Sequence, residues 1–343
     1  MGDGSRPAAA TAKRGRVSQR ADRRHRAGTG RTTLRLRLAG GYLAGQELNV
    51  KTVTALTNRL GNRSNNQDRC LVLEKAGRVL LVVADGMGGH ARGELAAQTA
   101  IDSLSRSFMA QQGRIDKPQE FLRKALHAAH LEVVDAGRAA DPPVNPRTTC
   151  VACLVQDDQA CWAHAGDSRL YLLRGGTLLT RTRDHTPVEE LLQSGVITED
   201  ELHSHPLRNS VSRCLGGGLK LPKVSFDQAT LQENDMLLLC SDGLWSALPE
   251  HRLAELPADG DLEHTVNLLT DEAELASYPH SDNISLVCLR WLSAGMQTQA
   301  DPAAAILAET AAALPANQEN DPLQEAINDI HRAMLEYASE MKK

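Results

Sequence analysis

Residues 78–94 read RVLLVVADGMGGHARGE, and this stretch carries a pattern that the rest of the chain repeats. Its first half is a continuous Val and Leu run of strand length, which predicts a strand. Asp85 ends the run and Gly86 follows, a pair that permits a sharp turn. A carboxylate at such a strand end is held by rigid backbone yet faces solvent. The carbonyl of Gly86 could act beside it as a ligand of a hard divalent cation.

Three further aspartates stand next to apolar runs: Asp167 in HAGDSR, Asp242 in LLCSDGLW and Asp282 in HSDNISLV. One Asp-Gly pair would be an ordinary turn, but four aspartates in the same context predict a shared site. Carboxylates gathered without a cation would repel one another and lose hydration, so their convergence implies bound metal. Because the chain has no HExxH or paired Cys/His spacing, Mg²⁺ or Mn²⁺ is favoured over Zn²⁺.

Strand-like runs and helical stretches are grouped rather than strictly alternating. Helical spacing covers residues 93–109 and 118–136, between the second and third strand-like runs, and residues 262–275 before the last. This order predicts an α+β fold with largely antiparallel sheets. The strand-like runs are CLVLE, RVLLVVAD, TTCVACLV, ACWAHAG, SRLYLLRGG, DMLLLCSDG and ISLVCLRW.

Over about residues 53–291 the chain resembles the protein phosphatase 2C family of metal-dependent serine/threonine protein phosphatases. The resemblance implies a β-sandwich of two mostly antiparallel sheets flanked by helices, in α-β-β-α layers. It also implies a flap at about residues 186–218 that shapes access to the active site. The motifs that carry it are RSNNQD (63–68), DGMGGHARGE (85–94), TT (148–149), AGDSRLY (165–171), DHT (184–186), HPLRN (205–209), SDGLW (241–245) and SDNIS (281–285).

The resemblance also implies a set of metal ligands, carried over motif by motif. Asp85 would bridge two Mn²⁺ or Mg²⁺ ions, and the carbonyl of Gly86 would ligate one of them. Asp242 and Asp282 would complete the set. In bacterial members the aspartate of GDSR helps to hold a third ion, and Asp167 occupies that position.

Two further residues receive roles from the same resemblance. Arg63 would grip the substrate phosphate, which suits a guanidinium because it can meet two phosphate oxygens at once. Asp68 would orient metal-bound water. The implied reaction is hydrolysis of phosphoserine or phosphothreonine in proteins by a water or hydroxide bridging two metal ions, with no protein nucleophile.

Met87 marks a departure from eukaryotic-type members, which have histidine at this position. A thioether cannot donate a proton, so the DGMGG form resembles the bacterial branch and the acid that protonates the leaving group stays open. His90 is a candidate for that role, although a lone histidine is more often structural.

Charge divides the chain into a basic arm and an acidic body. Residues 1–37 hold eleven Lys and Arg against Asp3 and Asp22, a net charge of +9, and the remainder carries −14. We expect residues 1–50 to be a disordered arm, because they are too poor in large apolar groups to fold alone. Without aromatic residues between its arginines, nucleic-acid binding is not favoured. Residues 51–293 form the expected catalytic domain.

Residues 294–343 are expected to form a helical extension. Within residues 321–343 an apolar stripe at alternating spacings of four and three predicts a helix that packs on the catalytic domain or contacts a partner. The stripe consists of Leu323, Ile327, Ile330, Met334 and Tyr337.

Cysteine usage and hydropathy bear on the compartment. The seven cysteines are scattered, which suits reduced thiols, and Cys150 and Cys153 lie in a strand-like run without a second CxxC. No apolar run approaches the roughly 20 residues needed to cross a bilayer. The expected location is therefore cytoplasmic, with no membrane partner.

The expected partners are phosphoprotein substrates of a serine/threonine protein kinase in signal transduction. Two alternatives remain at this point. One is a phosphatase fold that only binds or regulates a partner. The other is a phosphatase of small phosphate esters, which would use the same site.

Overall fold

The computed structural model describes residues 52–88, 92–198, 201, 205–208, 210–256 and 260–292. The expected arm (1–50), the expected C-terminal extension (294–343) and His90 lie outside the described residues. In the part of the chain that is described, no helix is long and apolar enough to cross a membrane.

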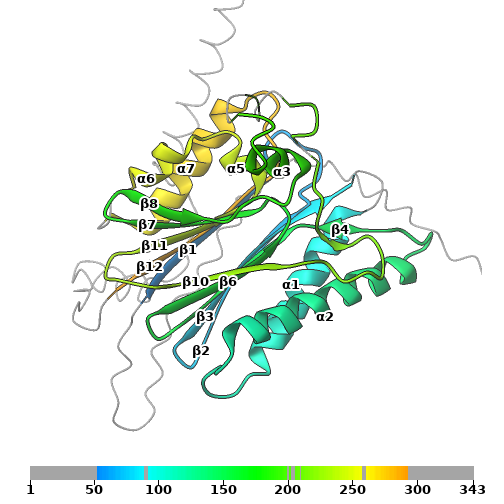
Figure 1. Cartoon of the computed structure of the whole chain (residues 1–343), viewed down its shortest axis with the longest axis horizontal. Helices are drawn as coiled ribbons and strands as arrows, with labels where there is room; N and C mark the ends of the chain where they lie inside the picture. Colours follow the sequence, from blue (N-terminus) through cyan, green and yellow to red (C-terminus); the bar gives the residue numbers. More distant parts are fainter. Residues whose placement is uncertain are drawn as a thin grey trace, which may run out of the picture. The chain divides into compact units, whose positions relative to one another are not determined.

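Within the described residues, the strands form two antiparallel sheets (Figure 1). In the five-stranded sheet the strand order is β1 (Thr52–Arg59), β12 (Ile284–Trp291), β11 (Met236–Cys240), β7 (Arg169–Arg174) and β8 (Thr177–Arg181). The seven-stranded sheet runs β10 (Ser225–Thr230), β6 (Gln159–Ala165), β5 (Cys150–Gln156), β3 (Arg78–Met87), β4 (Arg147–Thr148) and β9 (Leu215–Gly216), with β2 (Asp68–Lys75) on β3.

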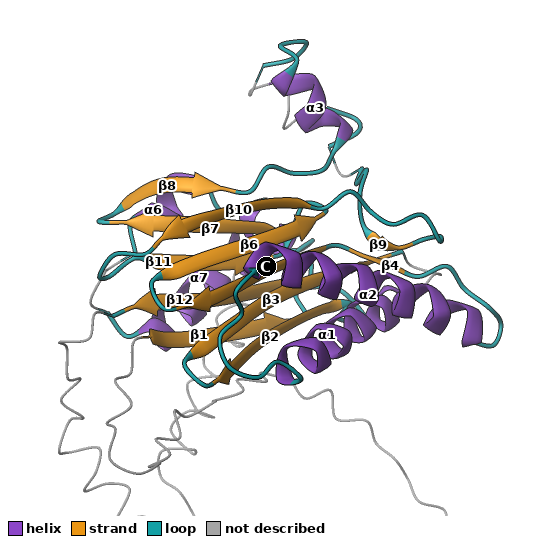
Figure 2. Cartoon of the chain, turned by 60° about the horizontal axis from the view of Figure 1, so that its bottom comes forward, coloured by secondary structure: helices purple, strands orange, loops and turns teal. Residues whose placement is uncertain are grey.

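Helices cover the outer face of each sheet. In Figure 2, α1 and α2 lie along the seven-stranded sheet, while α3 stands clear of both sheets. The helices α5, α6 and α7 pack on the five-stranded sheet. This arrangement confirms the predicted α+β class and the α-β-β-α layers. The helices are α1 (Gly93–Met109), α2 (Pro118–Ala139), α3 (Pro187–Gln193), α5 (Asp242–Trp245), α6 (Glu250–Ala254) and α7 (Leu262–Ala276).

Strand β3 explains why its sequence is apolar without interruption. Its even-numbered residues from Leu80 to Ala84 pack against α1 and α2. Its odd-numbered residues from Val79 to Val83 face the other sheet. Because successive side chains of a strand point to opposite faces, a strand in the middle of a layered fold must be apolar on both. The same alternation aims Asp85 toward the space between the sheets.

The seven predicted strands and three predicted helices are present, and the structure adds elements that the sequence did not predict. Helix α2 continues to Ala139 rather than ending at Ala136, and α7 continues to Ala276 rather than ending at Leu275. The added strands are β1, β4, β8, β9 and β10, and the added helices are the short α5 and α6. Helix α3 lies at the start of the expected flap segment (186–218).

Candidate active site

Asp85 and Asp68 face each other at one end of the sandwich. They are register partners on the antiparallel strands β3 and β2, so their side chains lie on the same face of the sheet. Asp68 is 1% exposed, and its carboxylate accepts a hydrogen bond of 2.6 Å from the hydroxyl of Ser241. The backbone N–H of Ser285 donates to the same hydroxyl at 2.9 Å. Asp68 is thus tied to the ends of β11 and β12 in the opposite sheet.

Close backbone contacts hold the turns after Asp85 and Asp242 against neighbouring segments, and these contacts require glycine. A Cβ on Gly86 would lie 2.2 Å from the carbonyl oxygen of Gly93, the first residue of α1. A Cβ on Gly243 would lie 2.1 Å from the carbonyl oxygen of Asn283. No side chain fits at either distance, so these glycines allow the turns after Asp85 and Asp242 to pack directly against neighbouring backbone.

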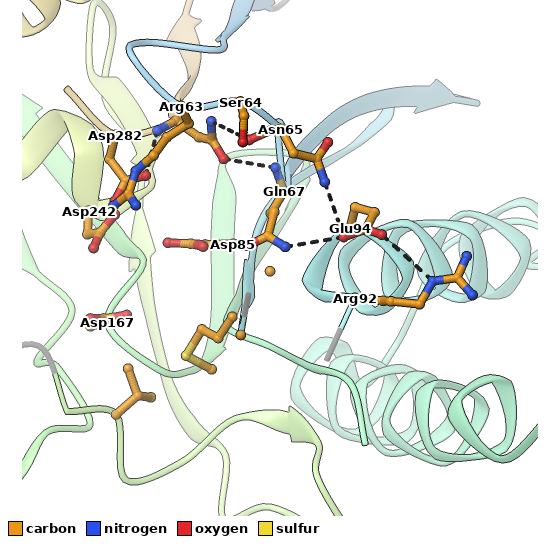
Figure 3. A pocket seen from close by; sticks show the side chains of 15 residues that line it. Arg63, Ser64, Asn65, Gln67, Asp85, Arg92, Glu94, Asp167, Asp242 and Asp282 are labelled. Carbon is orange, nitrogen blue, oxygen red and sulfur yellow. Dashed lines mark hydrogen bonds and ion pairs between the residues drawn. The ribbon is translucent and has the colours of Figure 1, made fainter. Parts of the chain in front are cut away.

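A cavity of about 480 Å³ opens at this end of the sandwich. Asp85, Asp167, Asp242 and Asp282 all line it, and Figure 3 shows their side chains around one space. The backbone of Gly86 contributes to the same wall. The four aspartates are as far apart in sequence as residues 85 and 282, so the fold brings together the carboxylates that the sequence analysis grouped. Asp68 lies behind the cavity rather than in its lining.

Arg63 stands at the rim of this cavity and pairs with Asp282. Its Nη2 lies 2.7 Å from Oδ2 of Asp282, and the pair raises the pKa of Arg63. The Arg63 side chain is 58% exposed, so the contact is open to water. A guanidinium at the mouth of a carboxylate-lined cavity is placed to meet an anionic ligand.

The buried carboxylates of the site have pKa values well above the ordinary range. Burial, opposed by the Ser241 hydrogen bond, raises the pKa of Asp68 to about 7. Burial and the charge of Asp242 raise the pKa of Asp167 to about 7. Burial raises the pKa of Asp242 to about 6, with Asp282 adding to the rise. For Asp85 the pKa is also raised, first by burial and then by Asp68, Asp242, Asp167 and Asp282.

Among the described residues, no group of three or more Asp, Glu, His or Cys side chains is already arranged to coordinate a metal ion. The donor set nevertheless fits a hard divalent cation. Its members are carboxylate oxygens, which such ions prefer, and their mutual repulsion is the kind that a cation relieves. Of the described cavity-lining residues, only Arg63 and Arg92 carry positive charge.

Hydrogen bonds join the loop that carries Asp167 to the residues just before α3. Arg169 makes two hydrogen bonds to Asp184, at 2.9 and 2.7 Å, and both side chains are buried. The guanidinium of Arg169 lies 3.7 Å from the ring centre of Trp245, whose Nε1 donates to the carbonyl of Asp167 at 2.9 Å. On the other side, Nδ1 of His185 accepts from the N–H of Gly166 at 3.2 Å.

Sequence reasoning missed Asn283 as a positioning residue. Its Oδ1 accepts from the N–H of Gln67 at 2.8 Å, and its Nδ2 donates to the carbonyls of Leu60 and Asn65 at 2.8 and 3.1 Å. These bonds fix the loop that carries Arg63. A polar residue between Asp282 and an apolar strand was the available signal, although its partners lie more than 200 residues away.

The cysteines take no part in this site. Each of the seven lies within the described residues and is free. Cys150 and Cys153 are buried in β5, and burial raises the pKa of Cys150 to about 12. Thiols in this state are poor nucleophiles and poor metal ligands.

Comparisons with known proteins identify relatives of this chain. The family model of "Protein phosphatase 2C" matches residues 57–278. The serine/threonine phosphatase stp of Listeria monocytogenes is 33% identical over 235 residues, which cover 67% of this chain and 92% of that protein.

Solved structures show the same fold. A serine/threonine phosphatase of S. agalactiae has a TM-score of 0.64 at 27% identity, covering 71% of this chain and 100% of that one. The catalytic domain of the phosphatase PstP, solved with two manganese ions, has a TM-score of 0.57 at 30% identity, covering 71% and 99%.

Proposed function

The chain belongs to the protein phosphatase 2C family and is a protein serine/threonine phosphatase, and we propose that it works with two Mn²⁺ or Mg²⁺ ions in the cavity at the end of the sandwich. Asp85, Asp242, Asp282 and the carbonyl of Gly86 would hold these ions, and Asp167 would contribute to a third. Such ions, when bound, lower the pKa of water and neutralise charge on phosphoryl oxygens. The observation that carries the proposal is the convergence of four strand-end carboxylates on one cavity.

Arg63 binds the substrate phosphate in this proposal. Its present partner, Asp282, is a carboxylate at the cavity mouth, and a phosphate presents the same kind of oxygen pair in the same place. A cation held by Asp282 would weaken the attraction of this carboxylate for the guanidinium and would leave Arg63 available to the phosphate.

Asp68 positions the attacking water in this proposal. Its carboxylate is buried behind Asp85 and fixed by Ser241, so it offers an acceptor that does not rotate freely. A fixed acceptor holds one proton of a water and directs the oxygen lone pair toward phosphorus. Met87 at the cavity wall has no proton to donate, so the leaving group must take its proton from a group other than this side chain.

The test compares para-nitrophenyl phosphate and a phosphothreonine peptide with Mn²⁺, Mg²⁺ or EDTA present. We expect hydrolysis with metal, none with EDTA, and loss of activity in Asp85→Ala with the fold intact by circular dichroism. Asp135→Ala is the matched control, because Asp135 is a 74% exposed carboxylate on α2 and does not line the cavity. Full activity in Asp85→Ala would refute the proposed site.

The same assay, with a nucleotide and a sugar phosphate added as substrates, addresses the two alternatives. A protein that only binds partners would hydrolyse neither substrate under any metal condition. A phosphatase of small esters would turn over a nucleotide or sugar phosphate in preference to the phosphopeptide.

A further inference from the structure

Arg92 is a second arginine of the catalytic cavity, and the proposed reaction gives it no role. It lines the cavity from the residue immediately before α1. Figure 3 shows Arg92 beyond Glu94 on the α1 side of Asp85, with its guanidinium directed away from the aspartates. A substrate whose phosphate meets Arg63 and whose chain continues over the start of α1 would pass this second positive charge.

The backbone of Arg92 adopts a conformation that arginine rarely takes. Its φ is 55° and its ψ is 60°, in the left-handed region, where the Cβ is crowded. Glycine or asparagine would fit this position with less strain. Gly93 packs against Gly86, so the chain cannot relax here without moving α1. Strain retained beside a catalytic cavity is a reason to look for a function of the side chain.

The charge of Arg92 is available to a ligand. Its side chain is 53% exposed, and its one ion pair within the described part of the chain is a 3.9 Å contact from Nε to Oε1 of Glu94. Oε2 of Glu94 is already shared by the amides of Asn65 and Gln67, at 3.4 and 3.2 Å. The terminal nitrogens of Arg92 make no hydrogen bond to any described residue, whereas Arg63 is held by Asp282 at 2.7 Å.

The cavity has room for more than a phosphoryl group. Its volume of about 480 Å³ equals that of roughly 16 water molecules at about 30 Å³ each. A phosphoryl group and the proposed metal ions fill part of this volume, and residues that flank the phosphorylated side chain would enter the remainder. An extended peptide advances about 3.3 Å per residue, which brings neighbours of the phosphorylated residue within reach of a long side chain.

We propose that Arg92 determines substrate specificity by binding an acidic group within about three residues of the phosphorylated serine or threonine. That group is a carboxylate or a second phosphate, since a guanidinium fork pairs with either. The inference rests on the proposed function, because it assumes that a phosphopeptide occupies the cavity.

The test measures kcat/KM for phosphothreonine peptides of equal length. One peptide is neutral, a second set carries one glutamate at each position from three before to three after the phosphothreonine, and a third set carries a second phosphate there. The parent protein is compared with Arg92→Gly, which suits the left-handed backbone, and with Arg92→Glu. Arg138→Ala is the control, since Arg138 is similarly exposed, at 58%, and has a similarly long ion pair of 3.6 Å on α2.

We expect the parent to favour at least one acidic peptide about fivefold, the factor that an exposed ion pair of about 1 kcal/mol gives. The ratio of kcat/KM for the acidic peptide to kcat/KM for the neutral peptide should fall to about one in Arg92→Gly and below one in Arg92→Glu. It should stay at the parental value in Arg138→Ala. Raising the salt concentration should reduce the parental ratio. Comparison of the glutamate and second-phosphate sets shows which source of negative charge is preferred.

Equal kcat/KM for neutral and acidic peptides in the parent would overturn the inference and leave the proposed function intact. So would an unchanged preference in Arg92→Gly. Hydrolysis of para-nitrophenyl phosphate without turnover of any phosphopeptide would overturn the proposed function and the inference together. Thermal unfolding of each variant separates lost specificity from lost folding, and Arg92→Gly decides the outcome if Arg92→Glu does not fold.

Discussion

Replacing Arg169 with methionine is expected to destabilise the protein strongly, because it leaves the buried carboxylate of Asp184 without its cationic partner. Arg169 and Asp184 are 9% and 8% exposed and share two short hydrogen bonds. Methionine keeps the apolar bulk of the side chain but removes the cation, so the Asp184 carboxylate stays buried without its partner. Breaking a buried ion pair in this way costs about 3–5 kcal/mol. The lost stacking of the guanidinium on Trp245 adds to that cost.

The expected change can be measured by thermal and urea unfolding of the full chain in EDTA. For a domain of this size, each kcal/mol lowers Tm by about 2–4 °C, so Arg169→Met should lower it by about 6–20 °C. The matched control is the double variant Arg169→Met/Asp184→Leu, which leaves no charge unpaired between these positions. It should recover about 2 kcal/mol or more of the loss.

Two results would refute this reasoning. One is a loss of less than about 1 kcal/mol in Arg169→Met, the range of an exposed ion pair. The other is a double variant as unstable as the single one, which would mean that packing rather than the stranded carboxylate sets the cost.

Three further predictions concern the site itself. In EDTA, Asp167 with its pKa of about 7 binds a proton that the unfolded chain releases near pH 4, so its contribution to stability is lost as pH rises from about 4 to about 7. Between about pH 4 and about pH 7 the free energy of unfolding should fall in both proteins, and the fall in Asp167→Asn should be smaller than in the parent by at least about 1 kcal/mol, measured by urea titration. Equal falls would contradict this pKa. Arg63→Ala should raise KM for a phosphopeptide about tenfold or more, with a smaller effect on kcat, because a charged hydrogen bond to the phosphate is lost. An unchanged KM would show that Arg63 does not bind the phosphate. Gly93→Ala should lower stability by about 1–3 kcal/mol in the same unfolding assay, because its Cβ would lie 2.5 Å from the backbone of Gly86; a neutral result would show that α1 can shift freely.

Strands in the interior of the sheets were predicted from the sequence, while the edge strands β1, β8 and β10 were not. The strands β3, β5, β11 and β12 are mainly apolar because each lies inside the layers. By contrast, β10 reads SFDQAT and is partly or fully exposed along its length, so its pairing with β6 leaves no periodic signal. The same holds for β8, whose outward side carries the 46% exposed Leu179.

The identity of the cavity aspartates was within reach of the sequence because each stands at the end of a recognisable run. Their partners were not. The ion pair between Arg63 and Asp282 joins residues 219 positions apart. The bridge from Ser241 to Asp68 likewise depends on how the two sheets face each other, which no local pattern encodes. The predicted domain boundaries at residues 50 and 293 remain predictions, since the segments beyond them lie outside the described residues.

Asp68 and Asp85 are register partners on β2 and β3, so the chemistry of the site depends on the register of these two strands. A slip of one residue would turn one carboxylate away from the other while leaving a hydrophobic run of similar length to pack. Such a molecule would keep its layers, its circular dichroism and its proposed cation ligands, yet lose the acceptor that positions the attacking water. After refolding, the activity per bound manganese ion would therefore report correctly aligned molecules, which spectroscopy of the backbone alone would not distinguish.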